Sequence, residues 1–259
     1  MKNKWAIVLG CSTGHGAAIS KQLASEGMGI IGFHLDRGAI KKEAQELEKE
    51  IALMNGAKVK FWNENAADKE VMFKRMPEIS DLVGSGQVKL LMHSIAFGST
   101  TNFFEPTPVR QRQMDMTQHV MAHCLIYWTQ ALLEKKFLTN GSRIVGLTSE
   151  GSYKAMEGYG PVGVAKASLE AVVRQIGWEL GKQGITANTI QAGITPTRAL
   201  TKISEDWEKW VETTKERNPM KRVTTPEDVA GLVSLLMSDK ADFVNCSTIF
   251  CDGGEHRSL

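Results

Sequence analysis

Short apolar runs alternate with longer amphipathic stretches from one end of this chain to the other, and this alternation constrains the fold most. The runs are nearly continuous in apolar residues, as expected for parallel strands that are covered on both faces. The stretches between them are long enough to form the helices that connect parallel strands. The sequence therefore predicts an α/β fold, a doubly wound parallel sheet with helices on both faces.

The pattern predicts seven strands and six helices. The expected strands are Trp5–Gly10, Gly29–His34, Lys58–Trp62, Lys89–Ser94, Ser142–Thr148, Thr186–Gln191 and Thr248–Asp252. The expected helices are Ala17–Glu26, Ala39–Asn55, Lys69–Asp81, Pro108–Leu138, Tyr159–Lys182 and Pro226–Ser238. With no linker, repeat or low-complexity tract, residues 1–259 are expected to form a single domain. Thr195–Val223 is irregular and follows a strand end, so we expect it to form a lid over the carboxyl edge of the sheet.

Charge and composition argue against several classes of partner. The net charge is +2 and no block of like charges occurs, so neither a nucleic acid nor a membrane surface is expected to bind. No apolar run reaches spanning length, and the residues from Met1 to Lys4 lead directly into the first strand without a signal-like segment. None of the cysteines forms a Cys-x2-Cys pair, which favours buried free thiols and a cytoplasmic location. These cysteines are Cys11, Cys124, Cys246 and Cys251.

A glycine-rich turn, residues 10–16 (Gly-Cys-Ser-Thr-Gly-His-Gly), follows the first strand and opens the first helix. Glycines there let the backbone turn sharply and approach a diphosphate, which the helix N-terminus stabilises. The alternative is a plain tight turn, but the strand-turn-helix context favours dinucleotide binding. We expect His15 to face solvent or to act indirectly, and not to be catalytic. The cofactor contacts expected from this turn are Gly10, Ser12, Thr13, Gly14 and Gly16.

Tyr159 and Lys166 are separated by six residues within an expected helix. This spacing places the two side chains about two turns apart on nearly the same face. A tyrosine titrates near pH 10 unaided, so a nearby cation would help its hydroxyl to donate protons at neutral pH. The same ammonium could hydrogen-bond a cofactor ribose.

Together, Gly-x3-Gly-x-Gly, Tyr-x6-Lys and Asp252-Gly253-Gly254 resemble the short-chain dehydrogenase/reductase family over essentially the whole chain. The resemblance implies a Rossmann-type seven-stranded sheet, a nicotinamide cofactor and usually a homotetramer, with a homodimer as the smaller possibility. Residues 93–98 (His-Ser-Ile-Ala-Phe-Gly) resemble the corresponding segment of the enoyl-acyl-carrier-protein reductase branch. That branch implies NAD(P)H-dependent reduction of the double bond of a 2-enoyl thioester, carried on acyl-carrier protein or coenzyme A.

The resemblance also implies roles for individual residues. Tyr159 would stabilise the enolate, Lys166 would hold the nicotinamide ribose, and Ser149 would either donate a second hydrogen bond or cap a strand end. Asp36 and Arg37 stand side by side where an acid favours NADH and a base favours NADPH, so both cofactors remain possible. The implied cofactor contacts beyond the turn are Arg37, Asn65, Ser94, Ile95, Ala96, Lys166, Ile194 and Thr197.

Some features depart from the pattern of the best-known enoyl reductases. Those enzymes place an aromatic residue nine or ten positions before the tyrosine, where this chain has Ser149, a residue typical of carbonyl-reducing members. A divergent branch of enoyl reductases has serine there. Tyr153 is either an extra hydroxyl or a packing residue, and Met121 replaces the central-helix asparagine of ketone-reducing members. The alternatives are therefore a carbonyl reductase or alcohol dehydrogenase, such as a 3-oxoacyl reductase, and a non-catalytic NAD(P)-binding sensor.

Two further pairs of residues remain open to interpretation. His119 and His123 have the spacing of a zinc-binding pair, but no third ligand completes a site, so no metal is expected. Trp207 and Trp210 either line an acyl tunnel or seat the lid on the body of the protein.

Overall fold

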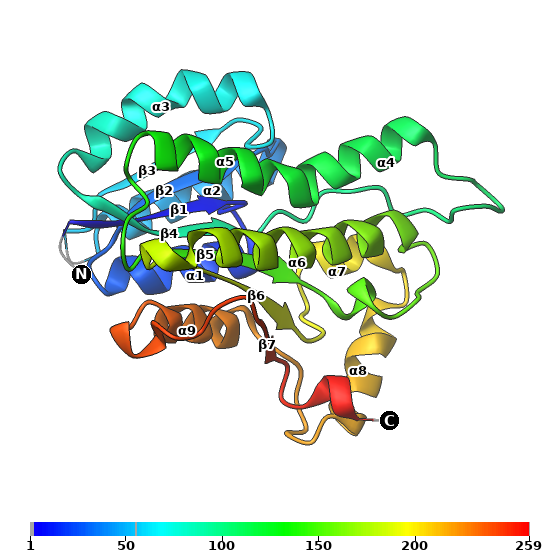
Figure 1. The fold of residues 1–259 in the computed structure, drawn as a ribbon. Coiled ribbons are helices and arrows are strands. Elements are labelled where there is room, and N and C mark those ends of the chain that lie inside the picture. The colour runs from blue at the N-terminus through cyan, green and yellow to red at the C-terminus, as the bar shows by residue number, and fades with distance from the viewer. Residues whose placement is uncertain (1–2, 55, 259) are drawn as a thin grey trace.

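The structure, a computed structural model, describes residues 3–54 and 56–258. Within them, parallel strands form one seven-stranded sheet in the order β3-β2-β1-β4-β5-β6-β7, which confirms the predicted doubly wound fold (Figure 1). The strands are β1 Lys4–Leu9, β2 Gly29–His34, β3 Val59–Asn63, β4 Gln87–His93, β5 Arg143–Thr148, β6 Thr186–Ala192 and β7 Thr248–Cys251.

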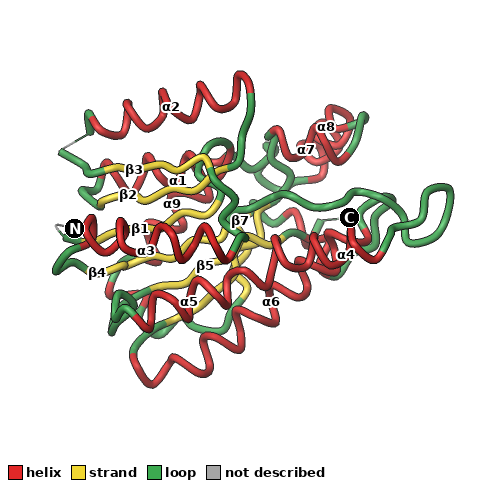
Figure 2. The backbone as a smooth tube through the Cα atoms, turned by 90° about the horizontal axis from the view of Figure 1, so that it is seen from above, coloured by secondary structure: helices red, strands yellow, loops and turns green. Residues whose placement is uncertain are grey.

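Helices cover both faces of this sheet, with α1, α2 and α9 on one side and α3, α5 and α6 on the other (Figures 1 and 2). Side chains of β1 alternate between the two cores: Ala6 and Val8 pack toward α1 and α9, whereas Ile7 and Leu9 pack toward α5 and α6. Burial on both faces explains the continuous apolar runs. The helices are α1 Gly14–Ser25, α2 Gly38–Ala52, α3 Lys69–Val83, α4 Gln111–Gln118, α5 Cys124–Glu134, α6 Gly160–Leu180, α7 Arg198–Ile203, α8 Trp207–Arg217 and α9 Pro226–Leu236.

One predicted helix is wrong as a continuous α-helix. In place of Pro108–Leu138, a π-helical turn at His119–His123 separates α4 from α5. The amide of Cys124 donates to the carbonyl of His119, five residues back, which leaves the Val120 carbonyl to side chains. His93 Nε2 lies 3.1 Å from that oxygen and Cys124 Sγ lies 3.2 Å from it. The interruption of the α-helix is therefore accompanied by a contact between the π-helical turn and His93 of β4. The spacing of apolar residues in the sequence does not predict this interruption.

Other boundaries differ from the prediction by a few residues, and Asn55, the expected end of the second helix, lies outside the described residues. All four thiols are free, but only Cys11 and Cys124 are buried, whereas Cys246 and Cys251 are half-buried. The prediction of buried thiols is thus right for two of them.

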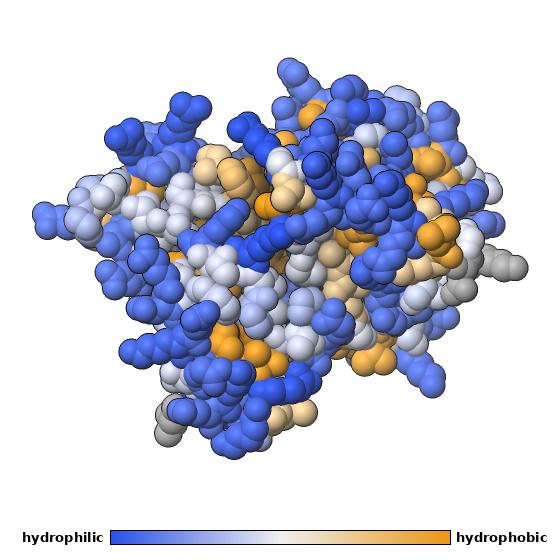
Figure 3. Space-filling model, turned by 180° about the vertical axis from the view of Figure 1, so that it is seen from behind, coloured by the Kyte–Doolittle hydropathy of each residue, from blue (hydrophilic) through white to orange (hydrophobic). Residues whose placement is uncertain are grey.

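The predicted lid contains α7 and α8, which lie beyond the carboxyl ends of the strands (Figures 1 and 2). The long connection between β4 and α4 projects beyond the same edge of the sheet. Seen from behind, the surface is mostly polar, with apolar side chains in small separate groups (Figure 3). Among the described residues, no helix combines the length and apolar character needed to cross a bilayer.

Candidate active site

A cavity of about 490 Å³ opens at the carboxyl edge of the sheet, between the glycine-rich turn, the ends of β4, β5 and β6, and the lid. The turn, the strand ends and the lid contribute most of the predicted site residues to its wall. Those that line it are Gly10, Ser12, Thr13, Gly14, Asn65, Ser94, Ile95, Ala96, Ser149, Tyr159, Lys166, Ile194 and Thr197. Gly16 and Arg37 do not line it.

Steric necessity explains the glycines of the turn. Gly10 has a φ of +90°, and a Cβ on it would lie 2.5 Å from the carbonyl oxygen of Ser94. A Cβ on Gly16 would lie 1.8 Å from the carbonyl oxygen of Gly10. Gly16 therefore allows the start of α1 to pack against the end of β1, and it supports the cavity from outside the wall.

Tyr159, Ser149 and Lys166 converge on one part of the wall. Tyr159 is buried at the N-cap of α6, and its hydroxyl lies 3.2 Å from Ser149 Oγ at the end of β5. Lys166, buried on α6, donates a hydrogen bond of 2.7 Å from Nζ to the carbonyl of Leu147. The helix and the neighbouring strand thus fix both side chains beside the same cavity.

Burial determines how these groups titrate. It lowers the pKa of Lys166 to about 8, against the opposing charge of Glu170. Burial also raises the pKa of Tyr159, outweighing its hydrogen bond with Ser149, and the charge of Glu150 raises it further. The Tyr159 hydroxyl is therefore protonated at pH 7 and can donate a hydrogen bond.

Of the two adjacent charged residues after β2, the acid Asp36 lines the cavity and the base Arg37 does not. Asp36 lines the wall, and its Oδ2 lies 2.8 Å from Nδ1 of His34, which also lines it. The Asp36 backbone amide donates to Asn63 Oδ1 at 2.8 Å, which fixes the chain after β2. Arg37 is exposed and lies outside the wall.

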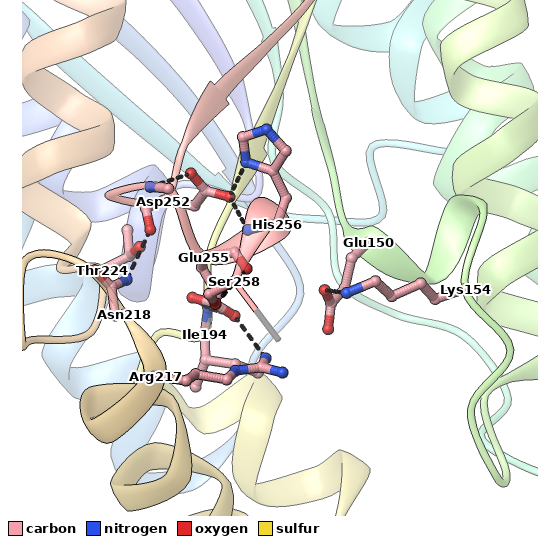
Figure 4. A network of polar contacts seen from close by, with 12 residues as sticks. Glu150, Lys154, Ile194, Arg217, Asn218, Thr224, Asp252, Glu255, His256 and Ser258 are labelled. Carbon is pink, nitrogen blue, oxygen red and sulfur yellow. Dashed lines mark hydrogen bonds and ion pairs between the residues drawn. The ribbon is translucent and has the colours of Figure 1, made fainter.

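Glu255, which sequence reasoning did not identify, connects the C-terminal segment with the loop after β6. It is 2% exposed and lines the cavity, and its Oε2 accepts a 3.0 Å hydrogen bond from the amide of Ile194 (Figure 4). Burial raises its pKa, and Arg217 of α8 approaches its Oε1 at 3.7 Å. Its only signal in the sequence is a charge directly after Asp-Gly-Gly.

The Asp252-Gly253-Gly254 segment forms a tight turn that also holds the lid. The Asp252 carboxylate accepts from the amides of Gly254 and His256 at 3.0 and 2.9 Å. Asn218, at the end of α8, donates from Nδ2 to the Asp252 carbonyl at 2.9 Å (Figure 4). This motif follows β7 directly and is hydrogen-bonded to the end of α8. It therefore fixes the lid relative to the sheet.

His15 is placed differently from the prediction. Its ring lines the cavity, and its Nδ1 is buried without a hydrogen-bond partner among the described residues. Burial and the nearby charge of Lys166 lower its pKa to about 4. The first turn of α1 borders the cavity, and the half-buried His15 lies at its wall.

Apolar side chains line the part of the cavity near the lid. Trp210 belongs to this lining, whereas Trp207 and Tyr153 lie outside it. Tyr153 is exposed and accepts a hydrogen bond of 3.1 Å from Gln191. The other apolar residues at this end include Phe97, Met116, Val120, Leu200 and Ile203.

The remaining residues singled out in the sequence have contacts of other kinds. Met121 is buried in the π-helical turn and does not line the cavity. His119 Nε2 lies 2.7 Å from the carbonyl of Ala67, which is a structural contact. Within residues 3–54 and 56–258, no group of three or more possible metal ligands occurs.

The residues present fit a dinucleotide. Two glycines leave room for close backbone approach, and the wall includes an acid after β2 and a tyrosine with a lysine beside β5, with β1 and β4 between these two strands in the sheet.

Comparisons with known proteins agree with this geometry. The chain is 29% identical over 259 residues to the NADH-dependent enoyl-[acyl-carrier-protein] reductase of Enterococcus faecalis, covering 99% of this chain and 98% of the relative. Its fold is similar to that of the enoyl-(acyl-carrier-protein) reductase of Anaplasma phagocytophilum in complex with NAD (TM-score 0.81, 23% identity, 98% and 92% coverage). It is also similar in fold to a 3-oxoacyl-[acyl-carrier protein] reductase of Brucella melitensis (TM-score 0.82, 20% identity, 100% and 99% coverage). The family model described as enoyl-(acyl carrier protein) reductase matches residues 10–256, and the chain belongs to this family of oxidoreductases.

Proposed function

We propose that this protein reduces the carbon–carbon double bond of a 2-enoyl thioester with NADH or NADPH, in fatty-acid synthesis or a related pathway. The observation that carries the proposal is the buried Tyr159 hydroxyl, paired with Ser149 at 3.2 Å beside Lys166 in a cavity of dinucleotide-binding form. The apolar lining near the lid suits an acyl chain.

The chemistry supplied by a bound reduced nicotinamide is hydride donation, here to the β-carbon of the enoyl group. In the proposed mechanism, Tyr159 donates a hydrogen bond to the thioester oxygen as negative charge develops there. Ser149, within hydrogen-bond distance of that hydroxyl, orients it or donates to the same oxygen. The Leu147 carbonyl holds the Lys166 ammonium in place. Lys166 supplies a positive charge beside Tyr159 and Ser149, and it can donate a hydrogen bond to a ribose hydroxyl.

NADH is the cofactor that the far end of the cavity favours. An inward-facing carboxylate accepts hydrogen bonds from a ribose diol and repels a 2′-phosphate. Asp36 supplies that carboxylate, and Arg37 is exposed and does not line the cavity. Arg198 also lines the cavity, but its guanidinium pairs with Glu43 at 2.7 Å.

Carbonyl reduction is the second candidate, because Ser149 beside the tyrosine would also suit a ketone oxygen. Cofactor oxidation measured with crotonyl and acetoacetyl thioesters separates the two activities. We expect turnover of the crotonyl substrate and little with the acetoacetyl one. Turnover of ketones or alcohols alone would contradict the enoyl assignment.

A non-catalytic NAD(P)-binding sensor is the remote alternative. Such a sensor has no need of Tyr159, so Tyr159→Phe would leave its biological activity unchanged. An enoyl reductase would lose activity in the same variant.

The carrier, the assembly and the location complete the proposal. We propose that the acyl group arrives on acyl-carrier protein. The chain acts as one domain, with residues 195–223 as its substrate lid. It works in the cytoplasm, where its free thiols remain reduced. We also propose a homodimer or homotetramer. The outer edge of β7 has no strand partner among the described residues, and Trp178 and Phe243 are strongly exposed (76% and 103%).

A further inference from the structure

Glu150 places a negative charge in the wall of the cavity, next to the residues proposed for catalysis. It follows Ser149 directly and lines the cavity together with Tyr159. A Cβ on Gly151 would lie 2.3 Å from Cε1 of Tyr159, so the backbone after Glu150 packs directly on the tyrosine ring. Burial raises the pKa of Tyr159 most, and the charge of Glu150 raises it further, as expected of a carboxylate near the hydroxyl.

This carboxylate opposes the proposed chemistry when it is not compensated. Hydride transfer to the β-carbon moves negative charge onto the thioester oxygen, to which Tyr159 donates a hydrogen bond. A second negative charge on Glu150 repels that oxygen, and the repulsion is stronger where water is excluded than in bulk solvent. The repulsion grows as the charge develops, so it raises the barrier of the reaction more than it weakens substrate binding.

Lys154 is the cation that pairs with Glu150. The carbonyl of Glu150 accepts hydrogen bonds from the amides of Tyr153 and Lys154, at 3.1 and 2.8 Å, which brings the lysine back beside the glutamate. Lys154 Nζ lies 2.8 Å from Oε2 of Glu150 (Figure 4). The lysine side chain is 40% exposed, against 20% for the glutamate, and it does not line the cavity. The ammonium therefore offsets the carboxylate charge without occupying the space of a substrate.

Glu255, the acid near Ile194, has a similar arrangement. It lines the same cavity, and Arg217, which does not, lies 3.7 Å from its Oε1. Burial raises the pKa of Glu255 most, and the charge of Glu150 also raises it, so the two carboxylates act on each other. In both pairs the acid lines the cavity and its base does not.

We infer that Lys154 is a positioning residue for the reaction: its ammonium neutralises Glu150 and so allows negative charge to develop beside Tyr159. This inference rests on the proposed reduction of an enoyl thioester. Lys154 acts through Glu150 and contacts neither substrate nor cofactor. Its effect on the rate should therefore depend on the charge of Glu150, which a purely structural role would not.

The test is steady-state kinetics of the full chain with crotonyl thioester and saturating NADH. Lys154→Met removes the ammonium, and we expect it to lower kcat about fivefold while KM for the thioester remains within about twofold. Adding Glu150→Gln to that variant should restore kcat to within about twofold of the unaltered protein, because no uncompensated charge remains. Lys154→Arg keeps the charge and should also remain within about twofold.

Lys49→Met is the matched control. Lys49 pairs with Glu46 at the same distance of 2.8 Å on α2, and neither residue lines the cavity. This variant should leave kcat unchanged. Thermal unfolding of each variant separates a loss of catalysis from a loss of folding, and Lys154→Gln replaces Lys154→Met in the series if the methionine variant does not fold.

The outcomes separate this inference from the proposed function. If the unaltered protein does not reduce crotonyl thioester, the proposed function is wrong and the inference falls with it. If it does, the role assigned to Lys154 is overturned by any of three results: an unchanged kcat in Lys154→Met, a loss that lies in KM alone, or a loss that Glu150→Gln does not restore.

Discussion

At the scale of single residues, the Tyr159 hydroxyl is a hydrogen-bond donor that stays protonated at neutral pH. Burial raises its pKa, and Ser149 lies within 3.2 Å of its hydroxyl. A protonated donor suits stabilisation of a developing enolate, for which the hydroxyl must carry its hydrogen at the operating pH. The sequence motif indicates the residue, but its protonation state depends on how deeply it is packed.

We expect Tyr159→Phe to lower kcat by about 10²–10³-fold, because one donor to the developing oxyanion is lost. NADH affinity should remain within about twofold. Ser149→Ala should lower kcat by about tenfold, because Tyr159 still provides its donor. Steady-state kinetics with crotonyl thioester and a separate NADH titration check these values. A serine variant as inactive as the phenylalanine variant would contradict this division of roles.

Lys166 provides a prediction about pH. Its lowered pKa of about 8 means that the ammonium is present below pH 8 and is lost as the pH rises through that value. NADH affinity of the free protein should therefore weaken between pH 7 and 9. Lys166→Arg keeps its charge throughout this range, so its affinity should stay level. The same decline in both proteins would show that another group titrates.

At the element scale, the start of α1 packs directly against the end of β1. A Cβ on Gly16 would overlap the Gly10 carbonyl at 1.8 Å, so Gly16→Ala should lower the free energy of unfolding by about 2 kcal/mol or more. Gly231, within α9, has no atom within 4 Å of its Cβ position. Gly231→Ala should therefore be neutral or stabilising by up to about 1 kcal/mol. Denaturant unfolding of both variants measures the contrast.

The lid and the loop after β6 meet at Glu255 (Figure 4). Glu255→Ala would leave the Ile194 amide without its acceptor, and we expect NADH affinity to fall about tenfold. Glu255→Gln retains an acceptor oxygen and should remain within about threefold. Glu216→Ala, an exposed acid on α8, is the matched control and should bind normally. Equal losses in the alanine and glutamine variants would point instead to the Arg217 ion pair.

At the scale of the whole molecule, one edge of the sheet has the features of an interface. Asn245 donates from Nδ2 to the Gly177 carbonyl at 2.9 Å, which brings the segment before β7 beside α6. This segment carries the exposed Phe243, and α6 carries the exposed Trp178. An unpaired strand edge flanked by apolar side chains favours association with a second copy.

We expect Phe243→Asp combined with Trp178→Glu to lower the oligomeric state, because two desolvated charges oppose association. Sedimentation velocity measures the change. Phe73→Asp, on the outer face of α3 where Phe73 is 55% exposed, is the control and should leave the oligomer intact. An oligomer that persists in the double variant would exclude this edge as the interface.

The sequence alone determined that helices cover both faces of one parallel sheet, and at which edge of the sheet the active site lies. Continuous apolar runs require burial on both faces, and glycine is required wherever the backbone of the turn meets another backbone, so the sheet and the edge that binds ligands could be predicted. The Tyr-x6-Lys spacing indicated two side chains of one site, because Lys166 lies on α6 and Tyr159 is the N-cap of the same helix.

Only the tertiary structure decided the features that depend on contacts between distant segments. The π-helical turn accompanies a contact between His93 and Val120, and the burial of Glu255 depends on the packing of the C-terminal segment against Ile194. That His15 and Asp36 line the cavity and Arg37 does not depends on how α1 and α2 pack on the sheet. Such contacts join residues far apart in the chain, and helical or strand periodicity describes only neighbours along it.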